Sequence, residues 1–287
     1  MIPSIDFIQP KNIEELLSLL NNFPDESCII AGGTDIIPGM QQGASRFKKF
    51  KRLIDIHHLP ELKLIKVEDG VLIIGAGVTF SDIIKSSLTQ NHFPLLTKAA
   101  SSVGSVQIRN RATIAGNFIN NAPCADSVPP LLVYDAMVRI HSFNNQYDIA
   151  LKDLLLKPYQ TKMEPNEIVT QISLPILSET YRGEFYKLGR RQGVAISRIS
   201  IAVLIDIHQS RIMDIRIASG AITPIGKRFP ELEKFARQKK LEIKLLKELA
   251  RKLGKEILIT TGLRWSTPYK LPVVQQIFFQ LLSNITK

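Results

Sequence analysis

The chain has 287 residues, 45% of them hydrophobic, and a formal net charge of +11. This length and composition fit a globular protein with a sizeable core, in two domains rather than one, and exclude a fibrous or disordered chain. No apolar run approaches the roughly 18 residues of a membrane span. The N-terminal stretch MIPSIDFIQPKNIEELLSLL lacks a signal peptide's basic and long apolar regions, so we expect a cytoplasmic protein with no membrane span.

The two cysteines, Cys28 and Cys124, do not form a CxxC motif. A disulfide framework is therefore not expected, and a reducing compartment is favoured. An iron–sulfur cluster usually takes four thiolates, so this chain is not expected to hold one. We assign no metal ligand and no catalytic residue from the sequence.

The basic excess is concentrated in residues 227–256, which hold eleven Lys and Arg against five Asp and Glu. Leu and Ile recur there at helical spacing with charges between them, which predicts amphipathic helices with a solvated basic face. No zinc-ligand spacing, RNA-binding aromatic pattern or basic zipper accompanies the charge, so nucleic acid is not the expected partner.

The first half of the chain mixes helices and strands. Residues 11–20 predict a helix, because Asn12 can cap its start and Glu15 follows three residues later. Residues 27–31 predict a buried strand that runs into a Gly-Gly turn, and 52–59 predict another strand. Residues 62–78 predict a hairpin around an Asp-Gly turn.

Two helices are expected at 79–88 and 93–103. After them, residues 111–130 (RATIAGNFINNAPCADSVPP) show no continuous helical or strand period and are interpreted as a loop. The apolar run 129–143 is expected to end as a strand, and 167–176 predict a strand that finishes at a proline.

The pattern changes near residue 177, where we place a domain boundary. Residues 183–191, 195–207 and 212–222 predict three strands of an antiparallel sheet. The basic helices follow, and a last helix is expected near 270–285. Strands first and helices after indicate an α+β arrangement.

Two loops have the composition of a ligand cradle. In IIAGGTDIIPG (29–39) a buried strand ends in glycines, which allow a positive φ and a close approach of the backbone to a ligand. TIAGN (113–117) repeats the same chemistry, so the two loops are candidates for opposite sides of a pyrophosphate. Asp126, nine residues after Asn117, is a candidate acceptor for sugar hydroxyls, although an Asx-type cap explains it equally well.

Known phosphate motifs do not fit this chain. There is no GxxxxGK[ST], so the chain is not a P-loop protein. GAGVTF (75–80) has Phe80 where GxGxxG needs its third glycine and follows a hairpin, which excludes a Rossmann site.

The stretches AGGTD, SVGSVQIRNRATIAGNFINNAPCADSVPPLLVYDA and YKLGRR resemble the FAD-binding subunit of the molybdenum hydroxylases, the xanthine dehydrogenase and carbon monoxide dehydrogenase family. The resemblance extends over essentially the whole chain, and the order and spacing of the motifs make it specific. It implies an α+β fold. A vanillyl-alcohol-oxidase-type (PCMH-type) FAD-binding domain over 1–177, with subdomains of about 1–56 and 57–177, would precede a C-terminal three-stranded antiparallel sheet with helices over 178–287.

The resemblance implies FAD as the cofactor. The first loop would bind its pyrophosphate, the second would contact the pyrophosphate and approach the flavin, and Asp126 would lie on the ribose side. Val169 would touch the flavin, and Lys187 would lie near its polar edge, where a cation stabilises negative charge on the reduced ring. The implied FAD-binding residues are Ile30, Ala31, Gly32, Gly33, Thr34, Asp35, Ile36, Ile37, Thr113, Ile114, Ala115, Gly116, Asn117, Asp126, Val169 and Lys187.

One position departs from the family. Where relatives commonly carry two glycines, this chain has Ala115 followed by Gly116. The Ala115 methyl group is a candidate for crowding the pyrophosphate or excluding a positive φ. FAD binding is still expected, because backbone N–H groups supply the contacts.

The implied function is electron transfer within a heterotrimer. The substrate would be oxidised at the molybdopterin centre of a large subunit, and a purine such as xanthine is the first candidate. Electrons would pass through two [2Fe–2S] clusters on a small subunit to FAD, and then to NAD or another acceptor, in a dimer of heterotrimers.

Three alternatives stay open. Within the family, a carbon monoxide dehydrogenase or an aromatic heterocycle hydroxylase fits the same motifs. A non-enzymatic basic binding module with vacant glycine loops is the alternative of another class. A self-contained flavin oxidase is disfavoured, because the histidines lie far from both loops in the sequence; they are His57, His58, His92, His141 and His208.

Overall fold

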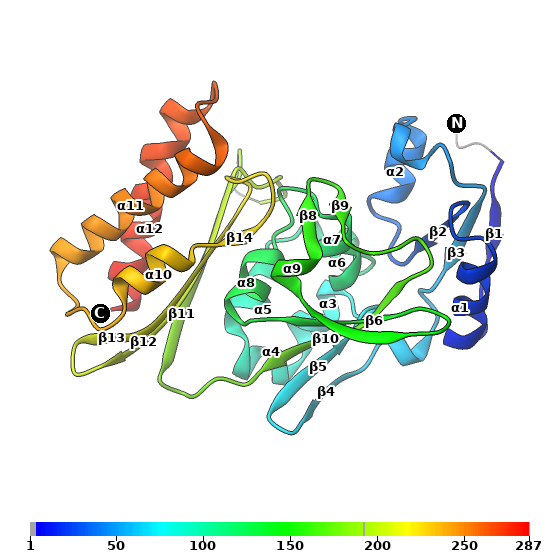
Figure 1. The fold of residues 1–287 in the computed structure, drawn as a ribbon, viewed down its shortest axis with the longest axis horizontal. Helices are drawn as coiled ribbons and strands as arrows, with labels where there is room; N and C mark the ends of the chain where they lie inside the picture. Colours follow the sequence, from blue (N-terminus) through cyan, green and yellow to red (C-terminus); the bar gives the residue numbers. More distant parts are fainter. Residues whose placement is uncertain (1–3, 192, 287) are drawn as a thin grey trace.

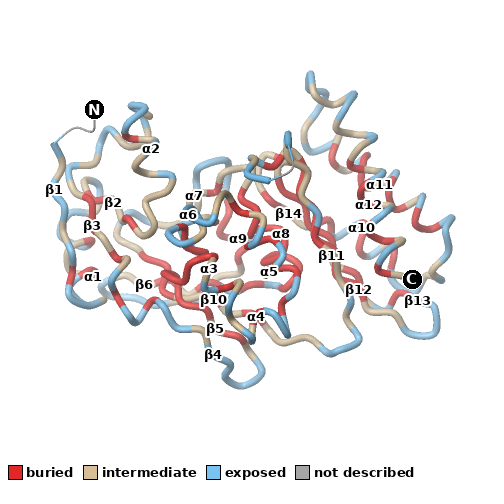
Figure 2. The backbone as a smooth tube through the Cα atoms, turned by 180° about the vertical axis from the view of Figure 1, so that it is seen from behind, coloured by how far each residue is buried: buried red, intermediate tan, exposed pale blue. Residues whose placement is uncertain are grey.

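The computed structural model describes residues 4–191 and 193–286. Figure 1 shows three lobes in a row, each built on its own sheet: an N-terminal lobe (6–55), a central lobe (60–175) and a C-terminal lobe (181–285). Buried residues are concentrated in the central lobe and along the C-terminal sheet (Figure 2). Within the described residues, no helix is long and apolar enough to cross a membrane.

The N-terminal lobe has a parallel sheet in the order β1-β3-β2. The predicted first helix is confirmed, and Asn12 caps it by accepting the backbone N–H of Glu15 at 2.9 Å. Leu16 and Leu20 of this helix join the central core. The elements of the lobe are β1 (Asp6–Ile8), α1 (Ile13–Asn22), β2 (Ser27–Ile30), α2 (Ile36–Gln41), the 3₁₀ helix η1 (Ser45–Phe47) and β3 (Arg52–Asp55).

The short helix α2 rests on a core of its own. Ile30, Met40 and Leu53 are buried together, and Ile36 and Ile37 pack against them. The first glycine loop therefore connects a buried strand to a helix that is anchored on the same small cluster.

The central lobe has an antiparallel sheet in the order β4-β5-β10-β6-β7. The predicted Asp-Gly hairpin is confirmed: Asp69 and Gly70 have φ of 49° and 74°, as a type I′ turn requires. The strands are β4 (Ile65–Glu68), β5 (Val71–Gly75), β6 (Met137–His141), β7 (Gln146–Ala150) and β10 (Ile168–Pro175), with a separate pair of β8 (Leu155–Lys157) and β9 (Gln160–Thr161). The helices are η2 (Pro60–Leu62), α3 (Phe80–Lys85), α4 (Ser87–His92), α5 (Pro94–Ser101), α6 (Val106–Arg109), α7 (Ile114–Asn120), α8 (Val128–Val133) and α9 (Leu151–Leu154).

The interpretation of 111–130 as one loop is wrong over α7. Thr113 caps this helix, because its Oγ1 accepts the backbone N–H of Gly116 at 3.2 Å. Ile114 and Phe118, one helical turn apart, are both fully buried. A helix of two turns shows too little periodicity to be recognised, and burial of one face stabilises it.

The C-terminal lobe confirms the predicted antiparallel sheet followed by helices, and adds a two-residue fourth strand. Its sheet is covered on both faces: Ile201, Val203 and Ile205 pack against the C-terminal helices, whereas Ala202 and Leu204 join the central core. The elements are β11 (Tyr181–Leu188), β12 (Ile199–His208), β13 (Arg211–Gly220), β14 (Lys227–Arg228), α10 (Pro230–Ala236), α11 (Ile243–Thr261) and α12 (Thr267–Ile285).

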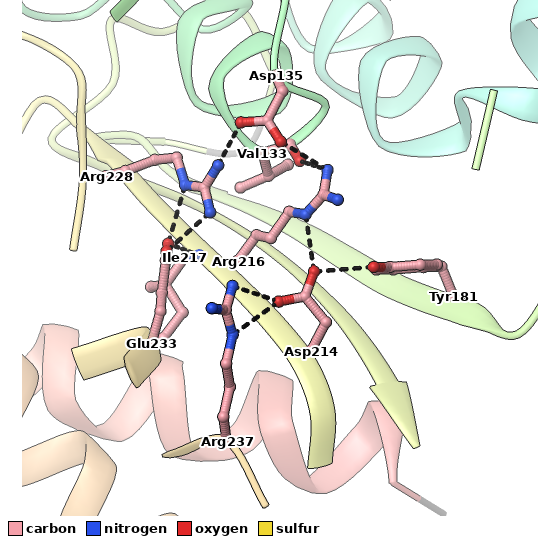
Figure 3. Close-up of polar contacts among 9 residues, drawn as sticks. All are labelled: Val133, Asp135, Tyr181, Asp214, Arg216, Ile217, Arg228, Glu233 and Arg237. Atoms are coloured by element: carbon pink, nitrogen blue, oxygen red, sulfur yellow. Dashed lines mark hydrogen bonds and ion pairs between the residues drawn. The ribbon is translucent and has the colours of Figure 1, made fainter. Parts of the chain in front are cut away.

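A polar network joins the central and C-terminal lobes (Figure 3). Asp135, just after α8, pairs with Arg216 at 2.9 Å and with Arg228. Arg216 also donates to the Val133 carbonyl at 3.1 Å and to Asp214 at 3.0 Å. Both arginines are largely buried, whereas the Asp135 side chain is 47% exposed, and the paired charges join the two lobes.

Candidate cofactor-binding site

The first glycine loop leaves the C-terminal end of β2 and enters α2. Gly33 has φ of +71°, a conformation that favours glycine and turns the chain toward the helix. The turn is closed by the N–H of Ile37, which donates to the Gly33 carbonyl at 3.1 Å. The described residues provide no acceptor for the backbone N–H groups of 32–35, so these donors are available to a ligand.

Gly32 brings the first loop against the second. A Cβ at this position would lie 2.1 Å from the Arg111 carbonyl oxygen and 2.9 Å from the Ala112 Cα. No side chain fits there, so glycine is required for the two loops to touch. The structure thus joins two segments that are about 80 residues apart in the sequence.

The second loop is fixed by its own contacts. Thr113 forms a bridge with Thr79, and the N–H of Ile114 donates to the Val78 carbonyl at 3.0 Å. Ala115 is only 6% exposed and belongs to the main core, whereas Gly116 is exposed. The Ala115 methyl group packs into the main core and its φ is not positive, so the backbone conformation at this position does not require a glycine.

Asp126 and Lys187 form a buried ion pair between the central and C-terminal lobes. Lys187 Nζ donates to Asp126 Oδ2 at 2.6 Å and to the Ser102 carbonyl at 2.7 Å. Ser197 Oγ donates to Asp126 Oδ1. Burial raises the pKa of the Asp126 carboxyl, and the Lys187 ammonium opposes that shift. Both carboxylate oxygens are thus engaged inside the protein, so Asp126 orients the ammonium.

Lys187 also lines a cleft of about 810 Å³ between these lobes. One wall is formed by 101–109 of the central lobe, and the other by the end of β11 and the residues after it, with Arg190 and Arg191. A volume in the range of 300–1,000 Å³ suits a cofactor-sized ring.

Several predicted residues place their side chains in the core. Ile30, Ile114 and Val169 are buried, and Ile36 and Ile37 pack on the small cluster under α2. From these positions only the main chain of the loops faces a ligand. Val169 lies beside the irregular pairing of β10 with β6, and within the described part of the chain no hydrogen bond or strand pairing joins it to the other predicted residues.

Three neighbours of the site are absent from the sequence prediction. Ser102 and Ser197 hold the Lys187–Asp126 pair, and no local signal identifies them. The third is His57, whose pKa is lowered by burial and by the charge of Arg111, the residue whose backbone touches Gly32. Its Nδ1 is buried and has no partner among the described residues.

Sequence comparison finds two matches that together span most of the chain. Residues 3–177 match the FAD binding domain in molybdopterin dehydrogenase, and residues 184–285 match the CO dehydrogenase flavoprotein C-terminal domain. The chain is similar to the xanthine dehydrogenase FAD-binding subunit of Escherichia coli O157:H7, with 30% identity over 95% of this chain and 92% of that protein. It is also similar to the nicotinate dehydrogenase FAD-subunit of Eubacterium barkeri, with 30% identity over 98% of this chain and 95% of that protein.

The solved structures agree with these matches. The structure of carbon monoxide dehydrogenase from Hydrogenophaga pseudoflava superimposes with a TM-score of 0.92 and 25% identity. The superposition covers 99% of this chain and 98% of that one.

Proposed function

Because the chain belongs to the family of FAD-binding subunits of xanthine and carbon monoxide dehydrogenases, we propose that it passes electrons from [2Fe–2S] clusters on a small partner subunit to NAD or another acceptor. The chain is an oxidoreductase subunit with FAD as its cofactor. The observation that supports the proposal is the pair of touching glycine loops next to a cleft that contains a buried, oriented ammonium group.

The residues present fit FAD. The free N–H groups of 32–35 match a pyrophosphate, which needs donors and little side-chain bulk. Gly116 is exposed in the second loop and offers no side chain to obstruct a ligand. We propose that Ile30 to Ile37 and Thr113 to Asn117 hold the pyrophosphate through their main chain, that Asp126 lies on the ribose side, that the ring occupies the cleft lined by Lys187, and that Val169 touches the flavin.

FAD supplies the redox chemistry when bound, since it accepts and donates electrons. The chain's own contribution is position and charge. Lys187 holds a positive charge at the cleft, where it stabilises negative charge. Asp126 and the Ser102 carbonyl keep that ammonium in place, because each accepts one of its hydrogen bonds.

The domain ranges follow from this proposal. We assign an FAD-binding domain to 1–177, with subdomains of about 1–56 and 57–177, and a C-terminal flavoprotein domain to 178–287. The cleft lies between the two domains, so electron transfer would take place at their interface.

We propose a cytoplasmic heterotrimer with a small [2Fe–2S] subunit and a large molybdopterin subunit, assembled as a dimer of heterotrimers. Relatives are named as medium chains or FAD subunits of dehydrogenase complexes, which supports partner subunits. Xanthine or another purine is the first substrate to test, because the xanthine dehydrogenase subunit is among the relatives at 30% identity. Carbon monoxide is the second candidate, favoured by the structural superposition.

The test begins with the visible absorbance spectrum of the purified full chain, taken before and after addition of FAD and desalting. Retained flavin bands support the cradle, whereas a chain that retains no flavin, and whose complex with its small and large subunits releases none on denaturation, refutes it. The reconstituted complex is then assayed for NAD reduction with xanthine and with carbon monoxide. Failure to reduce NAD or an artificial dye acceptor with either substrate removes both substrate assignments but leaves FAD binding intact.

A further inference from the structure

Arg46 of η1 connects the first glycine loop to the helix of the second. Its Nη2 forms an ion pair with Asp35 of the first loop. Its Nη1 donates to the side-chain oxygen of Asn120, the last residue of α7, at 2.8 Å. One guanidinium group thus connects the first FAD segment to the end of the helix that carries the second, and no local motif in the sequence indicates it.

Two aromatic rings hold this guanidinium. Its Cζ lies 4.5 Å from the ring centroid of Phe47 and 4.6 Å from that of Tyr159. Arginine loses little freedom in such a stacked position, because its planar fork is already ordered. The Arg46 side chain is 33% exposed, so water does not fully screen its contacts.

On the α7 side of this contact, hydrogen bonds fix the end of the helix. Asn121 ends α7 in a left-handed conformation and is buried. Its Nδ2 donates to the carbonyls of Lys157 and Gln160, both at 2.9 Å, and its own carbonyl accepts the N–H of Tyr159 at 3.0 Å. The turn that carries Tyr159 is therefore fastened to the end of α7.

On the N-terminal side of this contact, η1 and α2 are packed together with the first loop. A Cβ at Gly39 would lie 2.3 Å from the Phe47 ring, so α2 and η1 are in direct contact. Asp35 immediately precedes α2. Arg46, Asp35 and the first loop therefore form one packed unit, in which Ile36, Ile37 and Phe47 contact the small core and Ala31 contacts the central core.

The two contacts between the loops bracket the proposed pyrophosphate segments. Gly32 touches Arg111 at one end of both segments, and Arg46 binds Asn120 at the other end. The spacing between the free N–H groups of 32–35 and the exposed face of α7 is set by these two contacts.

We propose that Arg46 is a positioning residue for FAD, which clasps α2 and the first loop onto α7 and so sets the width of the pyrophosphate site. It also neutralises Asp35, whose carboxylate would otherwise repel the negative pyrophosphate. The inference rests on the proposed role of the two loops, but it assigns to Arg46 no contact with FAD itself.

The experiment compares FAD release from the full-length protein carrying Arg46→Ala, Arg46→Lys, Asn120→Ala or the double change Arg46→Ala/Asn120→Ala. Arg139→Ala is the matched control, because Arg139 also forms an exposed ion pair, with Asp148 of the central lobe, between β6 and β7. We expect Arg46→Ala to speed FAD release about tenfold, as for the loss of one hydrogen bond to a charged group. Arg46→Lys keeps the charge without the planar fork and should restore part of the difference.

The proposed contact between Arg46 and Asn120 predicts a result that a general loss of stability does not. Asn120→Ala should also speed release, and the double variant should be no faster than Arg46→Ala, because both changes break one contact.

Release from Arg46→Ala at the wild-type rate, or additive effects in the double variant, overturns the clasp. Failure of the wild-type protein to bind FAD in its assembled complex overturns the proposed function instead, so the two failures are distinguishable.

Discussion

Single substitutions at Ala115 and at Gly116 test the buried face and the exposed face of α7 separately. The Ala115 methyl group is buried in the main core, whereas Gly116 is exposed and a Cβ there would meet only Thr113 Oγ1, at 2.8 Å. We therefore predict that Ala115→Gly lowers stability and leaves FAD affinity within about twofold, the scatter expected of a change that removes no ligand contact. Gly116→Ala should instead weaken FAD binding about tenfold, as for a methyl group forced into a filled site.

The magnitude for Ala115→Gly follows from two contributions. A buried methyl-sized group accounts for about 0.8 kcal/mol. Glycine in place of alanine in a helix costs about 1 kcal/mol more. The free energy of unfolding should thus fall by about 2 kcal/mol.

Urea unfolding followed by far-ultraviolet circular dichroism measures the stability of both variants. Trp265 is a poor fluorescent probe, since it is 90% exposed. Titration of FAD-free protein with FAD measures affinity. A gain of FAD affinity in Ala115→Gly, or wild-type affinity in Gly116→Ala, contradicts the assignment of the two faces.

Three further predictions concern charges and thiols. Lys187→Met leaves Asp126 buried without its cation and should cost about 3–5 kcal/mol of unfolding free energy, while adding Asp126→Asn should recover part of it; an additive double variant in urea unfolding argues against the pair. The pKa of Asp214 lies below its usual value, because Tyr181 and two arginines bind the ionised form and outweigh burial. Its stabilisation is therefore present above about pH 4 and is lost as pH falls through the lowered pKa, so the deficit of Asp214→Asn should shrink in acid, and a deficit constant with pH in urea titrations contradicts this. Burial raises the pKa of Cys28 to about 12 and also raises that of Cys124, so both thiols should resist alkylation at neutral pH until the protein unfolds, and rapid labelling of native protein, read by mass spectrometry, excludes this.

The features that the sequence predicted correctly are formed by residues close together in the chain. The cap at Asn12 and the hairpin turn at Asp69 and Gly70 involve residues within a few positions of each other, so their patterns are visible in the sequence. Gly33 likewise needs its positive φ for a turn that begins and ends within the loop. Each of these features is confirmed.

Contacts between distant segments explain what was not predictable. Gly32 is required because the backbone of Arg111 passes over it, and the sequence shows only that a glycine is present. Asp126 was predicted as a sugar acceptor, but its partner Lys187 and the hydroxyl of Ser197 come from another lobe. α7 is helical because its apolar face is buried by other elements, which no pattern of seven residues can reveal.

The proposed site lies where lobes meet, and this has an energetic consequence. Free N–H groups and a buried ammonium cannot sit inside a single well-packed core without cost, but an interface can hold them and leave them accessible. The lobes are fixed by separate contacts: Gly32 and Arg46 on one side of the central lobe, and the Asp135–Arg216 network on the other. A ligand that touches all three lobes stabilises each of these interfaces by mass action, and each interface in turn contributes to its affinity. Residues that never touch FAD, such as Arg216, therefore belong to the energetics of the site as much as the glycines do.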